Sequence, residues 1–255
     1  MPTPSYLVFA DVDETLINCK SMFDFLQFRM IAEQGIRGGA EYLRIRADVQ
    51  AKADAGVPRE EINRSYYSLY AGEPVDRVAE LAARWFAERD AAGLFIESTE
   101  AALRDHRARG ATIVLVSGSF PALLAPVADR VGAAHLLCTR PLEHEGRYTG
   151  EVEVPVIGEA KADAVRTLLA AHPGVDPSQC YAYGDHTSDI PMMNCVGIPV
   201  VVGDHPEMKS YLAEREVTAL RLRLNPLRPT GGPEGRRIGG EEGTGVLFAG
   251  TGARP

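Results

Sequence analysis

Short apolar runs recur along the chain, separated by segments in which apolar residues return every three or four positions. The first run, at residues 6–10, is apolar throughout, which is typical of a strand buried on both faces of a sheet. Runs of similar length at 112–116, 135–138, 180–183 and 198–202 predict four further strands, the one at 198–202 being the last.

Helical periodicity fills the intervals between these runs. It predicts helices at 98–110, 120–131, 160–172 and 189–195. Strands that alternate with helices favour a mostly parallel sheet with right-handed crossovers. We therefore predict an α/β fold with a Rossmann-like parallel sheet core and helices on both faces.

The interval between the first two strands is the longest and shows helical patterns only. It predicts helices at about 21–34, 40–55, 60–70 and 75–90. Gly35 and the pair Gly38-Gly39 are expected to interrupt the pattern between the first two of them. We interpret the whole interval as an all-helical cap that is inserted after the first strand.

These patterns divide the chain into three parts. Residues 1–18 and 95–224 are predicted to form the core, and residues 19–94 the helical cap. Residues 225–255 contain many Gly and Pro and few large apolar groups, which predicts a disordered tail.

Composition limits the class of partner. The 255 residues carry a formal net charge of −8, which argues against a general nucleic-acid binder or membrane-surface protein. No apolar stretch approaches the roughly 20 residues needed to span a bilayer. The four cysteines are far apart and form no C-x-x-C, which favours reduced thiols and a cytoplasmic location over a disulfide framework or a zinc site.

Two aspartates, Asp11 and Asp13, come directly after the first predicted strand. Loops at the carboxyl ends of parallel strands are where open α/β sheets build their sites. Because Asp is disfavoured in strands and costly to desolvate, such a pair indicates a bound cation or a chemical role. For this pair taken alone, two helix-capping acids are the alternative interpretation.

Three later signals repeat the arrangement. Ser117-Gly118-Ser119 follows the second predicted strand and offers a hydroxyl and backbone N–H groups ahead of a helix, as an anion site does, although Ser-Gly is also common turn chemistry. Lys161 lies at a helix start, where a cation is unfavourable unless it is solvated or neutralises an anion. Asp185 and Asp189 follow the fourth strand, and Asp189 is also a reasonable helix cap.

In type and order, these residues resemble the motifs of the haloacid dehalogenase superfamily of phosphohydrolases. The matching positions are Asp11-x-Asp13-x-Thr15, Ser117, Lys161 and Gly184-Asp185-x-x-x-Asp189. The resemblance covers about residues 5–215. The helical insertion and the stretch after Asp189 are similar to the phosphoserine-phosphatase-like branch, subfamily IB.

The resemblance implies a role for each motif residue. Asp11 would attack phosphorus and form an aspartyl-phosphate, and Asp13 would act first as general acid and then as general base. The phosphoryl oxygens would be held by Ser117, the Gly118 N–H and Lys161. The implied Mg²⁺ ligands are Asp11, the backbone carbonyl of Asp13, Asp185 and, through water or by orienting the others, Asp189.

The resemblance also bears on the substrate. Phosphoserine phosphatases carry a Glu nine residues beyond the nucleophile, which pairs with the substrate ammonium, and that position here is Lys20. A cation there disfavours phosphoserine, unless Lys20 points to solvent. Arg44 and Arg46 are further candidates, because an arginine fork suits a carboxylate or a second phosphate.

We therefore predict a Mg²⁺-dependent phosphomonoesterase acting on a small phosphorylated metabolite other than phosphoserine. The alternatives are a phosphotransferase with the same intermediate, a phosphoserine phosphatase and a non-catalytic binding protein. The expected partner is a small phosphate ester, with no nucleic acid or membrane, and the expected state is a monomer or homodimer.

Overall fold

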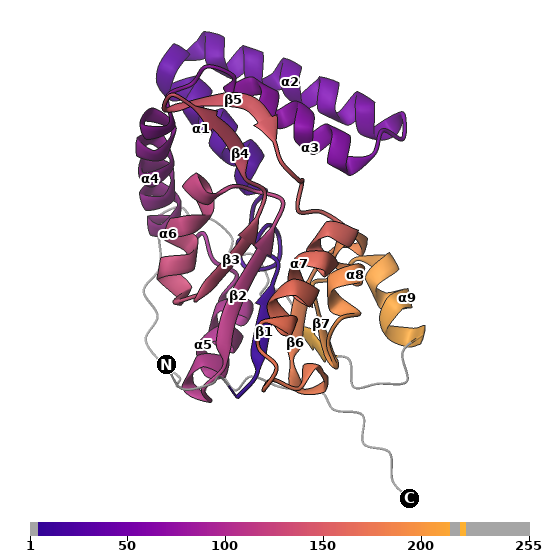
Figure 1. Cartoon of the computed structure of the whole chain (residues 1–255). Coiled ribbons are helices and arrows are strands. Elements are labelled where there is room, and N and C mark those ends of the chain that lie inside the picture. Colours follow the sequence, from indigo (N-terminus) through magenta and orange to yellow (C-terminus); the bar gives the residue numbers. More distant parts are fainter. Residues whose placement is uncertain (1–4, 215–219, 223–255) are drawn as a thin grey trace, which may run out of the picture.

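A computed structural model of the chain describes residues 5–214 and 220–222 (Figure 1). Its centre is a parallel sheet of six strands in the order β3-β2-β1-β6-β7-β8. The strands are β1 (Leu7–Ala10), β2 (Thr112–Ser117), β3 (His135–Cys138), β6 (Tyr181–Gly184), β7 (Ile198–Val202) and β8 (Leu220–Leu222). The flanking helices are α5 (Glu97–Ala108), α6 (Pro121–Val131), α7 (Glu159–Ala170), α8 (Ile190–Met193) and α9 (Pro206–Glu214).

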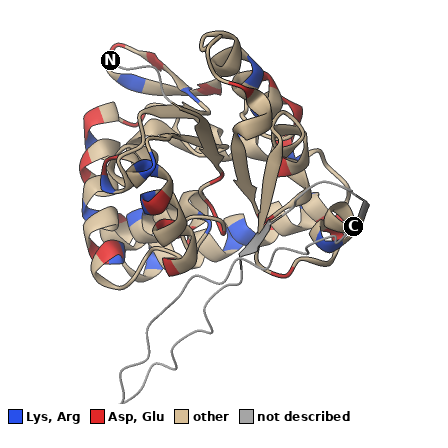
Figure 2. Ribbon diagram, turned by 90° about the horizontal axis from the view of Figure 1, so that it is seen from below, with Lys and Arg blue, Asp and Glu red and all other residues tan. Residues whose placement is uncertain are grey.

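Side chains of β1 are buried on both faces of the sheet, which explains why this run is apolar throughout. Val8 and Ala10 pack with residues of α5 and α6, whereas Leu7 and Phe9 pack with residues of α7 and α8. Figure 2 shows the layers from below, with tan strands between helices that carry both basic and acidic positions. The predicted α/β fold with helices on both faces is confirmed.

The prediction that β7 is the last strand is wrong, because β8 pairs with it in parallel register. A run of three residues is too short for periodicity to predict. The predicted tail at 225–255 lies outside the described residues. Within residues 5–214 and 220–222, none of the helices combines the length and hydropathy that crossing a bilayer requires.

The interval between β1 and α5 is helical, as predicted. It contains α1 (Ser21–Gln34), α2 (Ile36–Asp54), α3 (Arg59–Tyr67), a 3-10 turn (Ser68–Tyr70) and α4 (Val75–Ala91). The chain leaves and re-enters the sheet layer at neighbouring points, since the Asn18 N–H donates to the Leu94 carbonyl at 2.9 Å. The domain boundaries themselves stay a prediction.

A hairpin from the sheet-forming part of the chain packs on these helices (Figure 1). It consists of β4 (Pro141–His144) and β5 (Arg147–Val152), which pair in antiparallel register. Tyr148 and Val152 are buried in the same cluster as Trp85 and Tyr66 of the helices. The helical layer therefore shares its apolar core with a strand pair from elsewhere in the sequence.

The expectation that Gly38 and Gly39 interrupt a helix is wrong, because both lie inside α2. Only Gly35, with a φ of 58°, separates α1 from α2. Gly38 is needed for close approach of the two helices: a Cβ there would lie 1.9 Å from the Met30 carbonyl oxygen. Long-range packing, invisible to local propensity, explains this glycine.

The two adjacent glycines are expected to respond oppositely to replacement by alanine. Gly38→Ala should destabilise the protein by about 1–3 kcal/mol or more, because the added Cβ would overlap with the backbone of Met30. Gly39→Ala should stabilise it by up to about 1 kcal/mol, since the nearest atom to its Cβ, in Ile31, is 3.8 Å away. Urea unfolding midpoints measure both, and shifts of the same sign would refute this packing account.

Candidate active site

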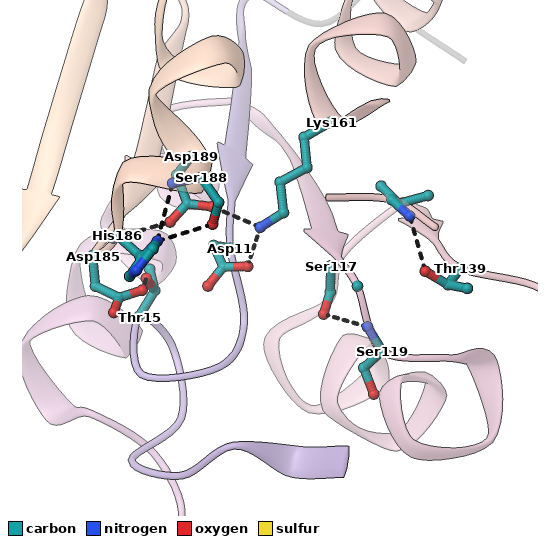
Figure 3. A network of polar contacts seen from close by, with 12 residues as sticks. Asp11, Thr15, Ser117, Ser119, Thr139, Lys161, Asp185, His186, Ser188 and Asp189 are labelled. Atoms are coloured by element: carbon teal, nitrogen blue, oxygen red, sulfur yellow. Dashed lines mark hydrogen bonds and ion pairs between the residues drawn. The ribbon is translucent and has the colours of Figure 1, made fainter. Parts of the chain in front are cut away.

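The sheet order brings three of the predicted motifs to one edge. Asp11 comes directly after β1, Ser117 ends β2, and Asp185 comes directly after β6, and β1 pairs with both of the other strands. The Asp11 N–H donates to the Tyr183 carbonyl at 3.0 Å, which anchors the loop to β6. Figure 3 shows these side chains converging from separate strands. The convergence is the one that strand-end chemistry predicts.

Lys161 provides the central contact of the site. Its Nζ lies 2.5 Å from Asp11 Oδ1 and 2.7 Å from Asp189 Oδ1 (Figure 3). Lys161 is only 4% exposed, so it is not the solvated lysine of the alternative interpretation. Burial lowers the pKa of Lys161, but the two carboxylates more than offset this and raise it above its usual value. Lys161 is therefore charged and holds the two acids together.

Three carboxylates form a cluster that suits a hard cation. One oxygen from each of Asp11, Asp185 and Asp189 lies within 4.8 Å of the others. Thr15 Oγ1 donates to Asp185 Oδ1 at 2.9 Å, and the capping role of Asp189 is limited to accepting from the His186 N–H at 3.2 Å. Burial raises the pKa of Asp185 to about 6, and it raises that of Asp11 well above its usual range. Oxygen donors in this number fit Mg²⁺.

Asp13 stands apart from the cluster, with a different environment. Burial raises its pKa to about 6, against the opposing effect of hydrogen bonding to Ser21. Its Oδ1 has no hydrogen-bond partner among the described residues. A carboxyl group with a raised pKa and a free oxygen is suited to giving and taking a proton near neutral pH.

Serine side chains link the surroundings of Asp13 to the loop at residues 117–119. Ser21 Oγ donates to Ser119 Oγ at 3.0 Å, and the Ser119 N–H donates to Ser117 Oγ at 3.1 Å. Ser119 belongs to the predicted Ser117-Gly118-Ser119 motif, whereas Ser21 is not part of any predicted motif. Ser21 is the first residue of α1, where a serine is ordinary, so no local signal marks it.

Two residues of α3 hold the loop at residues 117–119 from the helical side. Asn63 Nδ2 and the Tyr67 hydroxyl both donate to the Gly118 carbonyl, at 3.1 and 2.9 Å. Both side chains are buried, and their i, i+4 spacing on one helix was the only sequence signal. The two bonds fix the orientation of the peptide that follows Gly118. The helical layer thus positions the loop predicted to bind phosphoryl oxygens.

Removal of the Tyr67 hydroxyl is therefore expected to impair catalysis. In Tyr67→Phe the Gly118 carbonyl loses one of two donors, and a misplaced loop should lower kcat/KM for a phosphate ester about tenfold or more. Tyr70→Phe is the matched control, because among the described residues the Tyr70 hydroxyl bonds only that of Tyr66 in the helical core, at 2.6 Å. Equal kcat/KM values for the two variants would argue against a positioning role for Tyr67.

A cleft of about 340 Å³ lies between the sheet edge and the helical layer. The motif residues that line it are Asp11, Asp13, Ser117, Gly118, Lys161, Asp185 and Asp189. Of the predicted substrate-selecting residues, Lys20 and Arg46 line this cleft. The structure does not bring Arg44 to it: its side chain is 75% exposed and lies 2.6 Å from Glu41. Arg59, which the sequence analysis did not single out, also lines the cleft.

Comparison with known proteins identifies the family. The family model of haloacid dehalogenase-like hydrolases matches residues 8–194, so the chain belongs to this family, as its motifs indicate. A Mycobacterium tuberculosis (strain H37Rv) protein named a probable phosphatase is 41% identical over 97 residues. That match covers 38% of this chain and 33% of the relative, so it spans about a third of the relative's length.

Solved structures show the same fold. A Bordetella pertussis Tohama I protein of unknown function has a TM-score of 0.75 and 25% identity, over 85% of this chain and 98% of that one. A phospho-aspartyl intermediate analogue of phosphoserine phosphatase has a TM-score of 0.60 and 21% identity, over 81% of this chain and 90% of that one. Both likenesses show that the chain shares the fold of these proteins.

Proposed function

We propose that this protein is a Mg²⁺-dependent phosphomonoesterase that hydrolyses a small phosphorylated metabolite other than phosphoserine. One observation carries the proposal: buried Asp11 is held by Lys161 beside a carboxylate cluster and faces the same cleft as Ser117. Family membership and a relative named as a probable phosphatase support it.

In the proposed reaction, an Asp11 carboxylate oxygen attacks phosphorus as the bond to the leaving oxygen breaks. Asp13 gives its proton to that oxygen, so an alcohol leaves and an aspartyl-phosphate stays. Asp13 then takes a proton from water, whose oxygen attacks phosphorus and breaks the bond to Asp11. Inorganic phosphate and free Asp11 result, and Asp13 is again protonated.

Charge makes the first step feasible. A carboxylate and a phosphate dianion repel each other, and Lys161 lies against Asp11 where it neutralises part of that charge. The ammonium, Ser117 and the Gly118 N–H would hold phosphoryl oxygens during the transfer. Asp11, Asp185 and Asp189 would hold Mg²⁺, which supplies further neutralisation of the phosphoryl charge.

The cleft disfavours phosphoserine. An ammonium needs an anion. Among the described residues that line the cleft, Glu14 is the one carboxylate outside the four aspartates, and it already pairs with Lys20 at 3.4 Å. The other charged residues on the helical side are Arg46 and Arg59. A phosphotransferase would use the same intermediate, with an alcohol in place of water as acceptor. We further expect a cytoplasmic monomer or homodimer.

Phosphate release from a panel of esters, measured with Mg²⁺ and with EDTA, tests the proposal. The panel contains phosphoserine, sugar phosphates, nucleotides and phenyl phosphate, each with and without glycerol as an added acceptor. We expect Mg²⁺-dependent release that is abolished by EDTA and weakest for phosphoserine. Preferred phosphoserine turnover would indicate a phosphoserine phosphatase, glycerol phosphate as the main product a phosphotransferase, and no turnover a non-catalytic protein.

A further inference from the structure

We infer that the helical side of the cleft is a subsite for a second anionic group on the substrate, formed by Arg46 and Arg59 beside an apolar wall. This inference rests on the proposed phosphomonoesterase function, and it names the substrate class. The substrate would be a phosphate monoester whose leaving alcohol has an apolar or aromatic body and carries a carboxylate or second phosphate away from the ester.

Arg46 is left without an acidic partner by the pairing of its neighbours. Along α2, Glu41 pairs with Arg44 at 2.6 Å and Asp48 pairs with Lys52 at 2.8 Å. Among the described residues, no carboxylate lies within 4 Å of the Arg46 guanidinium. Arg46 is half-buried and lines the cleft, so its charge is presented to whatever occupies that space.

An aromatic ring holds the Arg46 side chain in place. The guanidinium carbon lies 4.3 Å from the centroid of the Phe23 ring, which also lines the cleft. Contact with a ring face leaves the N–H groups at the edge of the guanidinium able to donate in the plane. Paired N–H donors in one plane match the two oxygens of a carboxylate or phosphate.

Arg59 adds a second uncompensated charge from the first turn of α3. Its Nη1 lies 2.8 Å from His186 Nδ1, and no carboxylate lies within 4 Å of it among the described residues. An imidazole orients the guanidinium without cancelling its charge. Since Lys20 pairs with Glu14, the two arginines are the cations of the helical side that keep their charge for a ligand.

Apolar side chains line the same cleft as these two arginines. Met22, Val49 and Ile62 line it together with Phe23. A leaving group made only of hydroxyls and charges would lie against this wall without burying apolar surface. The combination of an apolar wall and two arginines instead fits an amphipathic leaving group with a terminal anion.

Three esters with the same phenol core test the inference: phenyl phosphate, its 4-carboxymethyl derivative and its 4-(2-aminoethyl) derivative. A 4-phosphonomethyl derivative distinguishes a carboxylate from a phosphate-type anion. We expect wild-type kcat/KM to be about tenfold or more higher for an anionic derivative than for phenyl phosphate, the scale of one charge-assisted hydrogen bond. The cationic derivative should be the poorest substrate.

Substitutions of Arg46 and Arg59 test whether these residues cause the preference for an anionic derivative. In Arg46→Gln and in Arg59→Gln, the ratio of kcat/KM for the anionic derivative to that for phenyl phosphate should fall towards 1, mainly through KM. Lys52→Gln removes a positive charge from α2, the helix that carries Arg46, at a position outside the cleft. It should leave the ratio unchanged. It controls for the loss of one unit of net charge.

The outcomes separate the two claims. Mg²⁺-dependent hydrolysis of phenyl phosphate without any preference for an anionic derivative would overturn the subsite and leave the proposed function standing. A preference that survives in both arginine variants would also overturn it. Failure to hydrolyse any ester with Mg²⁺, including the panel above, would overturn the proposed function and the subsite with it.

Discussion

Replacing Asp11 with asparagine is expected to lower phosphate release by about 10³-fold or more, because an amide oxygen does not replace a carboxylate nucleophile. The change is nearly isosteric, and Asp189 still pairs with Lys161 at 2.7 Å, so the fold should survive. Steady-state kinetics on the best ester of the panel, together with urea unfolding of the same preparation, measure both effects.

A matched control separates the chemistry of Asp11 from the general effect of losing a carboxylate. Asp105 lies outside the site and pairs with Arg109 at 2.9 Å on an exposed face of α5. Asp105→Asn should keep wild-type kinetics, since an exposed ion pair contributes little. An Asp11→Asn protein that matched the Asp105→Asn protein in activity would rule out the proposed nucleophile.

Replacing Lys161 with methionine is expected to damage both activity and stability. The variant keeps the volume but removes the charge that holds Asp11 and Asp189 together. Without Mg²⁺ at neutral pH, breaking a buried ion pair should destabilise the protein by about 3 kcal/mol. Loss of the cation facing the phosphoryl group should also lower kcat/KM by about 10²-fold or more.

The loss of stability in Lys161→Met is expected to depend on pH in one direction. Burial holds the folded-state pKa of Asp11 above its unfolded value, and removal of the Lys161 charge raises it further. The deficit in unfolding free energy should therefore be largest above that pKa and should shrink as the pH falls through it. Urea unfolding of wild type and variant across pH 5–8 measures the trend.

A second substitution sharpens the result. Lys161→Met/Asp189→Asn removes the repulsion between the two acids and should regain part of the stability, but not the activity. Lys161→Met with wild-type stability and wild-type kcat/KM would contradict the role that the structure gives to this lysine.

The strands and the motif residues at their ends follow from local sequence. An uninterrupted apolar run such as β1 predicts a doubly covered strand, and Asp11 directly after it has no local structural role that would explain it. Because parallel strands end at one edge of a sheet, Ser117 and Asp185 are expected near Asp11 even though they lie far away in sequence.

Contacts between distant segments are what the sequence does not reveal. Lys161 reads locally as an unfavourable cation at a helix start, and only its burial against Asp11, 150 residues earlier, explains it. Local propensity predicts that Gly38 breaks a helix, whereas the structure shows that it allows close approach to the Met30 carbonyl. The spacing of Asn63 and Tyr67 places them on one face of a helix, but it does not indicate that they hold the Gly118 carbonyl.

The substrate-selecting residues show the same limit. A count of positions from Asp11 identifies Lys20, but not that Glu14 pairs with it. Arg44 and Arg46 are indistinguishable by residue type and lie two positions apart, which places them in different directions around α2. Only the packed helical layer shows that Arg46, and not Arg44, lines the cleft.

Rapid quenching of the enzyme during turnover with Mg²⁺ and phenyl phosphate, followed by peptide mass spectrometry, detects the proposed aspartyl-phosphate itself. We expect a mass increase of one phosphoryl group on the peptide that contains Asp11, absent in Asp11→Asn and in EDTA. Turnover of the ester with no phosphoryl group on Asp11, or with one on a different residue, would contradict the proposed mechanism.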